Sequence, residues 1–207
     1  MEFIVDSFFS NIRKSVLSGL LIVFAGMTYL AIDNSFIGSL MFSFGLLAIL
    51  YKGYNLYTGK VGFISEIKDL PALLTTLLGN LIGLTAGSTI YRAVGTKAER
   101  LTSICESKLS NKWWQVLLLA ILCGVMMYLA VSLFRESKNP LMVMMPISVF
   151  ILCGFEHSMA SFFYFVACYG VGFFQPKIIG YILIMILGNA IGSLGWRFIE
   201  VKVKKEK

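Results

Sequence analysis

Long apolar runs, separated by short polar segments, make up most of the chain. A helix rises about 1.5 Å per residue and the hydrocarbon core of a bilayer is about 30 Å thick, so runs of this length are typical of membrane-spanning helices. The pattern predicts six such spans, in chain order: residues 16–32, 36–51, 70–91, 113–134, 141–169 and 178–199.

The segments around the spans complete a single transmembrane channel domain of residues 1–207. The first residues mix apolar and charged positions, as a helix lying at the membrane interface does. We expect five segments: an amphipathic helix at 1–14, a first repeat at 15–92, an extracytoplasmic connector at 93–112, a second repeat at 113–200 and a basic cytoplasmic tail at 201–207.

The amino-acid composition is that of an integral membrane protein. Hydrophobic residues make up 57% of the chain and charged residues 14%, whereas a soluble domain has roughly 25% charged residues. The net charge of +7 does not indicate nucleic-acid binding, because Lys and Arg follow the membrane topology. With the N-terminus inside, twelve of them fall on the inner side and six on the outer side. The positive-inside rule therefore favours a multi-pass protein of the inner (cytoplasmic) membrane with both termini cytoplasmic.

The fifth run, residues 141–169, is too long for one straight span. Its 29 residues would extend about 43 Å at about 1.5 Å per residue. Glu156 and His157, the only histidine, lie in its second half beside Gly154. Ionisable side chains at this depth are costly and by default mark a functional site. We therefore expect a broken helix, which is tolerated only where the break is buried in protein or lines a cavity.

An internal repeat relates the two halves of the chain. The pattern G-N-x-I-G at residues 79–83 recurs 109 residues later at 188–192, and the middle span of each half is interrupted, at 55–60 and at 154–158. Because each half has three spans, the halves must have opposite topology, and inverted repeats with paired broken helices place a solute path at their interface. The glycines could mark close helix packing alone, but the paired asparagines are amides that need hydrogen-bond partners when buried.

Three short motifs resemble those of a known family. Residues 154–158, G-F-E-H-S, are similar to the signature of the formate/nitrite transporters, residues 56–59, L-Y-T-G, resemble the L-F-T-G loop of their second helix, and the two G-N pairs resemble their paired G-N motifs. The resemblance implies an all-α integral membrane fold that is aquaporin-like, with six transmembrane helices in two inverted three-helix repeats and interrupted second and fifth helices. It also implies a homopentamer in which each protomer has its own pore.

The resemblance further implies a set of pore residues. Lys108 falls where the family has a pore lysine, and Thr58 lies in the loop of the interrupted second helix. The family's hydrophobic constrictions fall at Phe42, Leu46, Leu56 and Phe150.

The chain departs from the family pattern in three places. Ser161 stands where the signature usually continues with Asn, and Gly124 stands where a constriction often includes Asn. Only 20 residues separate Gly59 from Gly79, so the second half of the broken second helix should be short. The first two departures bear on the substrate and the third bears on the inner vestibule.

The expected path favours a neutral acid over an anion. A bare anion in an apolar constriction carries an idealised Born cost of tens of kcal/mol. Protonating an acid of pKa near 4 at pH 7 costs about 4 kcal/mol, at about 1.4 kcal/mol per unit. His157, which burial keeps neutral at rest, can lend and recover that proton.

Other side chains are expected to assist this relay. Lys108, the basic connector and the N-terminus of a half-helix would attract the anion first, although the connector could equally be a solvated loop. Asn80 or Asn189 could orient the imidazole and so fix which nitrogen faces the path. Glu156 would repel anions if it faced the path, so we expect it to bind the backbone of the interrupted helix.

These residues predict a channel or transporter for small monovalent anions of weak acids, such as formate, nitrite or hydrosulfide. The nearest alternative is a pore for small neutral solutes in the same fold. A membrane-embedded enzyme would need a second catalytic partner beside His157, and a membrane anchor or sensor would need a sizeable soluble segment. The sequence leaves open whether His157 is only a hydrogen-bonded core residue. It also leaves open which anion is carried, whether the protein is a channel or a proton-coupled transporter, the direction of flux and the gating.

No enzyme activity, cofactor or metal centre is expected. The four cysteines, Cys105, Cys123, Cys153 and Cys168, include no C-x-x-C pair, and the chain has one histidine. A metal site therefore has no obvious ligand set. Small packing residues are the plainer interpretation of these cysteines.

Overall fold

The computed structural model describes residues 2–95 and 97–205, and within them the side chains of residues 8–95 and 97–203. All regular structure in these ranges is helical. In chain order the elements are α1 (Glu2–Ala31), α2 (Ser35–Tyr51), α3 (Tyr57–Lys60), η1 (Val61–Phe63), η2 (Ile67–Asp69), α4 (Leu70–Val94), α5 (Ala98–Ser110), α6 (Trp113–Ser137), α7 (Leu141–Leu152), α8 (Ser158–Tyr169), η3 (Gly170–Phe174) and α9 (Pro176–Lys205).

The predicted interruption of the second and fifth spans is confirmed. Among the described residues, four helices are long and apolar enough to cross a membrane, and they fall in α1, α4, α6 and α9. The two remaining spans are each divided, the second into α2 and α3 and the fifth into α7 and α8. As the short spacing after Gly59 predicted, α3 has only four residues, against twelve in α8.

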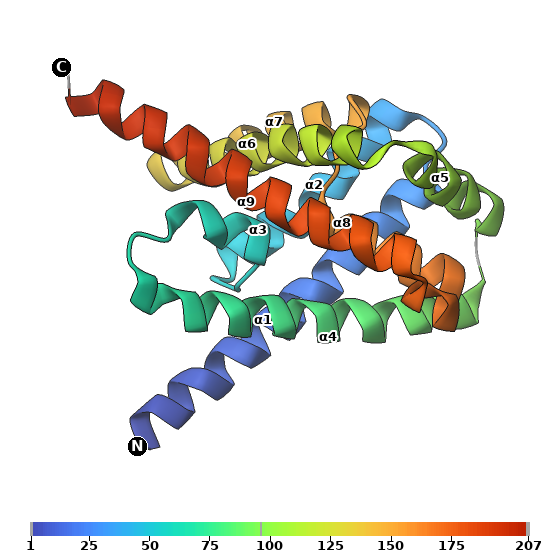
Figure 1. Cartoon of the computed structure of the whole chain (residues 1–207), viewed down its shortest axis with the longest axis horizontal. Helices are drawn as coiled ribbons and strands as arrows, with labels where there is room; N and C mark the ends of the chain where they lie inside the picture. The colour runs from blue at the N-terminus through green and yellow to red at the C-terminus, as the bar shows by residue number, and fades with distance from the viewer. Residues whose placement is uncertain (1, 96, 206–207) are drawn as a thin grey trace.

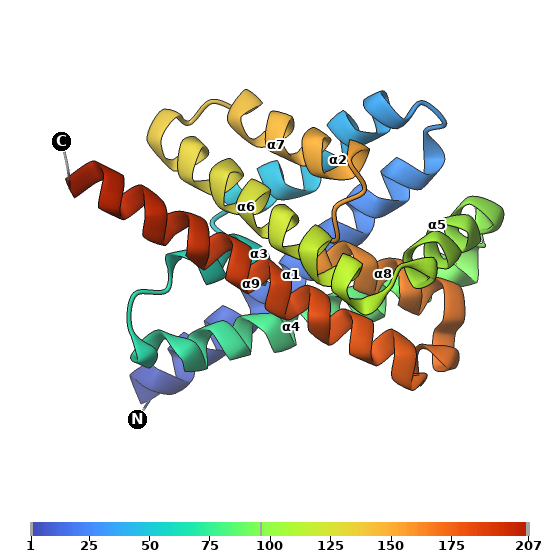
Figure 2. The same ribbon diagram turned by 45° about the horizontal axis from the view of Figure 1, so that its top comes forward.

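The two halves run in opposite directions through the molecule. In Figure 1, α1 begins and α9 ends at the left, while α5 lies at the right, and Figure 2 shows the same arrangement. α1 runs from left to right, whereas α6, which opens the second half, runs from right to left. The inverted repeat is thus confirmed. We call the two ends the α5 side and the tail side; which of them faces the cytoplasm stays a prediction.

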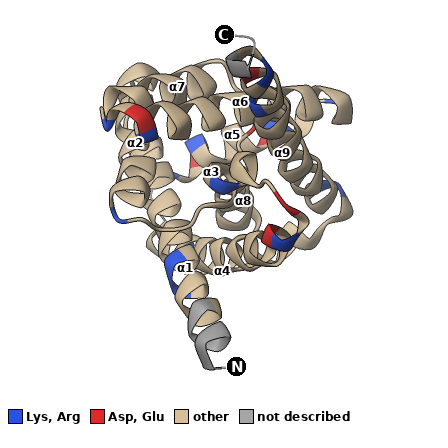
Figure 3. Cartoon of the chain, turned by 90° about the vertical axis from the view of Figure 1, so that its left-hand side faces the viewer, with Lys and Arg blue, Asp and Glu red and all other residues tan. Residues whose placement is uncertain are grey.

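The half-helices occupy the centre of the bundle. Figure 3 looks from the tail side and shows α3 and α8 surrounded by the longer helices, whose shafts carry few charged residues. The environment of the breaks is therefore protein rather than lipid, as unpaired backbone at membrane depth requires.

Several expected segment boundaries are not breaks in the structure. Residues 2–14 continue into the first span as one helix, α1, and residues 201–205 continue α9. The connector is not an irregular loop, because it contains α5, whose Leu101 and Cys105 are buried. α5 packs against α8 and so brings the connector to the central half-helix.

Both broken spans leave their first helix by the same turn. Gly53 after α2 and Gly154 after α7 have φ of 64° and 68°, in the left-handed region that glycine adopts at little steric cost. The amide after each glycine donates to the carbonyl five residues earlier, at 2.9 Å in the first half and 2.8 Å in the second. This is the Schellman ending of a helix, and its recurrence is a structural trace of the repeat.

The repeated motif also brings long helices into close contact. A Cβ at Gly83 in α4 would meet the backbone of Val16 in α1, and a Cβ at Gly192 in α9 would meet the backbone of Ile121 in α6. Small residues that let backbones approach are a main source of helix association in membranes. The packing interpretation of these glycines is therefore correct, and the asparagines beside them have a separate task.

Replacing Gly53 or Gly154 with alanine should destabilise the folded protein by about 1–2 kcal/mol, because a side chain disfavours the left-handed region. Gly180→Ala is the matched control. An added Cβ meets no atom within 4 Å at any of the three positions, but Gly180 lies inside α9, where alanine favours the helix. Thermal unfolding of the purified variants in one detergent measures the difference. Equal midpoints for all three would contradict this account of the breaks.

Candidate functional site

α8 begins in the middle of the protein, and two side chains bind its first amides. His157 precedes the helix, and its Nδ1 accepts from the amide of Ala160 at 3.1 Å. Oδ1 of Asn189, from α9, accepts from the amide of Ser158 at 2.9 Å. Its Nδ2 donates to the carbonyl of Glu156 at 2.8 Å and to a carbonyl of α6 at 2.9 Å. Asn189 therefore satisfies peptide groups on both sides of the break.

Asn80 does the same for α3 in the first half. Its Oδ1 accepts from the amide of Tyr57, and its Nδ2 donates to the carbonyls of Asn55 and Ser15, each at 2.8 Å. The prediction that the buried amides find hydrogen bonds is confirmed, since Asn80 and Asn189 are both 0% exposed. The expectation that one of them orients the imidazole is wrong, because their hydrogen bonds go to the backbone.

The two breaks meet at His157. Nε2 of its ring lies 3.0 Å from Oγ1 of Thr58 on α3. Because Nδ1 accepts from the Ala160 amide, the neutral ring carries its proton on Nε2 and donates it to the Thr58 hydroxyl. Phe150 stacks on the ring with centroids 5.4 Å apart and planes 11° from parallel. These three neighbours hold the buried imidazole in one tautomer and one orientation.

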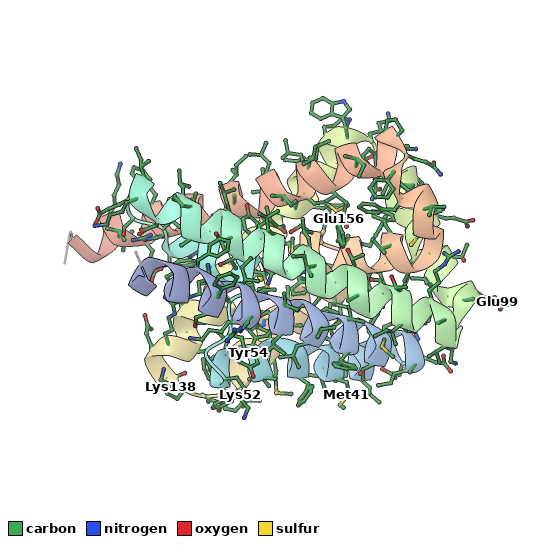
Figure 4. All side chains as sticks on the ribbon, turned by 90° about the horizontal axis from the view of Figure 1, so that it is seen from below. Met41, Lys52, Tyr54, Glu99, Lys138 and Glu156 are labelled. Carbon is green, nitrogen blue, oxygen red and sulfur yellow. The ribbon has the colours of Figure 1, made fainter. Side chains whose placement is uncertain are left out.

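Two cavities approach this point from opposite sides. The cavity on the α5 side has a volume of about 360 Å³, and His157 and Lys108 are in its lining. The cavity on the tail side has a volume of about 250 Å³, and its cationic lining residues are Lys60, Arg135 and Lys138. Figure 4 shows Lys138 toward one end of the long axis, Glu99 at the other and Glu156 between them.

The residues expected at the constrictions divide between the cavities. Phe42 and Phe150 line the α5-side cavity, with ring centroids 6.2 Å apart, and Leu46 and Leu56 line the tail-side cavity. All four side chains are buried. One helical turn of α2, from Phe42 to Leu46, thus leads from one cavity to the other past the imidazole. This arrangement supports the expected role of these four residues as constrictions.

Glu156 forms a buried ion pair. Nζ of Lys108, from α5, lies 2.6 Å from Oε2 of Glu156, and the hydroxyl of Ser161 donates to the same oxygen at 3.0 Å. The Glu156 side chain is 2% exposed and that of Lys108 is 16% exposed. The expectation that this carboxylate binds the backbone is wrong, since its bonds go to two side chains. Nor is Lys108 a free cation at the mouth, because Glu156 compensates its charge.

Two more cations, one at the end of α4 and one in the connector, bind the ends of other helices. Arg92 donates to the carbonyl of Cys168 at 2.9 Å, near the end of α8. Arg100 donates to carbonyls at the end of α1 and lies 3.7 Å from Asp33. Cations in these positions satisfy orphan carbonyls and complement the helix dipole. These two cations of the predicted outer side are therefore helix caps rather than free charges.

The structure shows the role of Gly124 and adds cations on the tail side that the sequence did not indicate as site residues. Gly124 lies where α6 crosses α9, because a Cβ there would meet the backbone of Asn189, so it is a packing residue. Lys60 and Arg135 were counted only as inner positive charges, although both line a cavity that ends near the site. The available signal was the position of Lys60, two residues after Thr58 in the interrupted span.

Comparisons with known sequences agree with this geometry. The profile of the formate/nitrite transporter family matches residues 4–199. The chain is 26% identical over 182 residues to the formate channel FocA of Haemophilus influenzae, covering 76% of this chain and 64% of that protein. It is 27% identical over 187 residues to the uncharacterised transporter YrhG of Bacillus subtilis, covering 77% and 68%. The chain thus spans about two thirds of the length of these relatives.

Solved structures show the same fold. A pentameric formate channel with formate bound superposes with a TM-score of 0.84 at 20% identity, over 98% of this chain and 99% of that chain. An ion channel of the same family superposes with a TM-score of 0.79 at 20% identity, over 95% and 89%. The six-span, aquaporin-like architecture is therefore confirmed.

Asn189→Ala should destabilise the protein strongly, because three peptide groups lose their partners and each unsatisfied group costs about 1–3 kcal/mol. Asn80→Ala should have a similar effect. Asn34→Ala is the matched control, because this exposed asparagine makes a single capping bond to the amide of Ile37, typically worth about 1 kcal/mol. The yield and thermal midpoint of folded protein report the difference. Equal midpoints for Asn189→Ala and Asn34→Ala would show that the breaks do not depend on the amide.

Lys108→Met should destabilise the protein by about 3–5 kcal/mol, because Glu156 is left as an unpaired buried charge. Adding Glu156→Gln should recover most of that loss. The control is Lys68→Met at the exposed pair with Glu66, whose side chains are 73% and 58% exposed and whose loss should cost under about 1 kcal/mol. Unfolding measurements on the single and double variants test this. Additive effects of Lys108→Met and Glu156→Gln would contradict the pairing.

Proposed function

The chain belongs to the formate/nitrite transporter family, and we propose that it conducts small monovalent anions of weak acids across the membrane, with formate, nitrite and hydrosulfide as the candidates. As a member of a transporter family it is not an enzyme. The observation that carries the proposal is the buried imidazole of His157, held by Thr58, Phe150 and the Ala160 amide where two cavities approach each other.

The geometry sets a condition on any proton relay at His157. The resting ring donates its only proton to Thr58, and loss of that proton would leave an imidazolate. A transferable proton must therefore first arrive from solvent at Nδ1, which gives up its bond from the Ala160 amide. An anion in the α5-side cavity would stabilise the resulting imidazolium. The anion then takes the proton and crosses between Phe150 and Leu56 as the neutral acid, which is far cheaper to desolvate than the anion.

Charge in the two cavities favours anions over neutral solutes. The tail-side cavity has three cations and no carboxylate among its described lining residues. On the α5 side Lys108 is compensated, so the dipole at the start of α8 adds the remaining attraction. A pore for neutral solutes needs none of these cations, so we propose the anion.

Assembly and orientation follow the resemblance. We propose a homopentamer with its termini in the cytoplasm, since one matching structure is a pentameric formate channel and twelve Lys and Arg lie on the predicted inner side. Apolar side chains such as Phe24, Leu78 and Leu183 face outward from the single chain, where lipid or a neighbour would cover them. The native mass in mild detergent tests the assembly, and a stable monomer would contradict it.

His157→Asn should reduce formate entry as the neutral acid by about a hundredfold, the lower range of a lost proton-transfer group. The Asn oxygen can still accept from the Ala160 amide, but the side chain cannot carry a proton. Formate uptake into liposomes at two pH values, normalised to folded protein, measures the loss. Thr58→Ser, which keeps the hydroxyl, is the control and should conduct. An unchanged rate and pH profile for His157→Asn would mean that His157 is only a hydrogen-bonded core residue.

A further inference from the structure

Two cysteines from distant parts of the sequence are neighbours on the α5 side. Cys105 is buried on α5, and its thiol lies 3.4 Å from the carbonyl of Tyr164 on α8. Cys168 is one turn further along α8, and its thiol lies 3.9 Å from the hydroxyl of Thr102, one turn earlier on α5. These two contacts fix the register of the helices and place the two thiols on facing turns of α5 and α8.

From this geometry we propose that Cys105 and Cys168 are a disulfide-forming pair that locks α5 to α8. A disulfide requires two cysteines whose Cβ atoms lie about 3.5–4.5 Å apart, and facing turns of packed helices such as α5 and α8 are where two cysteines can meet that requirement. The pair has no sequence signature because its members lie 63 positions apart. In the orientation proposed above, the α5 side faces outward, where disulfides form and persist.

The pair is oxidised by exchange with another disulfide, either of a small molecule or of a protein. Oxidised glutathione serves as the test oxidant, and we call it the probe. Cys168 is partly exposed, so its thiolate attacks the probe, displaces one glutathione thiolate and forms a mixed disulfide. Burial raises the pKa of the Cys105 thiol, which makes it the later nucleophile. Its thiolate then attacks Cys168 Sγ and releases the second glutathione. Overall the two cysteines lose two electrons and two protons, and the probe becomes two thiols.

The consequence for the site follows from the position of α5. Lys108 is one turn beyond Cys105 and reaches Glu156, and α5 contributes Ser103, Ile104 and Ser107 to the α5-side cavity. Along α5, whose residues are all described, the buried side chains are those of Leu101 and Cys105. Because so few side chains of α5 are buried, a disulfide would add a covalent bond between α5 and α8. That bond would hold the wall of the α5-side cavity and the Lys108–Glu156 ion pair in place. Its effect on transport rests on the proposed function, whereas formation of the bond does not.

The first measurement is chemical. In a Cys123→Ala/Cys153→Ala variant, Cys105 and Cys168 are the only cysteines left. The folded variant is incubated with oxidised glutathione, denatured and treated with a maleimide, and its mass is then measured by mass spectrometry. The expected mass is that of the chain less two hydrogen atoms, with no maleimide and no glutathione. The same variant with Cys168→Ala should instead take up one maleimide at Cys105.

Two maleimides on the pair variant, or a stable glutathione adduct with Cys105 still free, would overturn the proposal. If the pair variant does not fold, the same treatment of the wild-type protein followed by digestion should give a linked peptide containing Cys105 and Cys168. Its absence would equally overturn the pairing.

The second measurement is formate uptake by liposomes containing oxidised or reduced protein. Uptake should be slower when the disulfide is present, recover on reduction and be insensitive to glutathione in Cys168→Ala. Equal uptake with the disulfide demonstrated by mass would refute the lock. No uptake in either state would count against the proposed function and leave the mass result standing.

Discussion

Peptide groups that leave a helix at membrane depth must find hydrogen-bond partners inside the protein, and this requirement organises the structure. Asn80 and Asn189 meet it by the same three bonds, each holding an amide at the start of a half-helix and a carbonyl just before it. The third bond of each reaches a neighbouring long helix. Two side chains thus attach both breaks to the outer bundle.

The functional site depends on those attachments. Only because both half-helices begin at the centre can Thr58 of one approach His157 at the start of the other, 3.0 Å away. The break also fixes the tautomer of His157. Nδ1 of the ring caps the first turn of α8 by accepting from the Ala160 amide, so the proton of the neutral ring is on Nε2. A histidine on an uninterrupted helix would have neither constraint. The tautomer is therefore a consequence of the backbone rather than of a separate polar partner.

Charge is distributed unequally about this centre. On the α5 side, Lys108 is neutralised by a buried carboxylate that Ser161 also binds. On the tail side, the cations lining the cavity have no carboxylate among their described lining neighbours. The ion pair supports the wall near the imidazole, and removing one partner would cost more than the pair itself contributes. The anion-attracting field of the pore therefore comes more from the tail side and from helix ends than from Lys108.

Much of this arrangement could be predicted from the sequence. Two inverted halves with paired breaks were predicted from the overlong fifth run, from Glu156 and His157 within it and from the recurring G-N pairs. The length of a run, the positions of charged residues and the spacing of a repeat can all be read directly along the chain. The partners of Glu156 and of the two asparagines could not be predicted, because they depend on which helices cross beside the breaks. For the same reason the alignment of Gly124 with a constriction residue could not show that Gly124 allows α6 to approach Asn189.

We propose that the substrate crosses between Phe150 and Leu56 as a neutral acid that exchanges its proton at His157. The most direct test follows formate entry, internal pH and electrical current in the same protein-containing liposomes, after subtraction of protein-free liposomes. The account predicts that a proton enters with each formate, so the interior acidifies without net current. Formate entry that carries current and leaves the internal pH unchanged would contradict it.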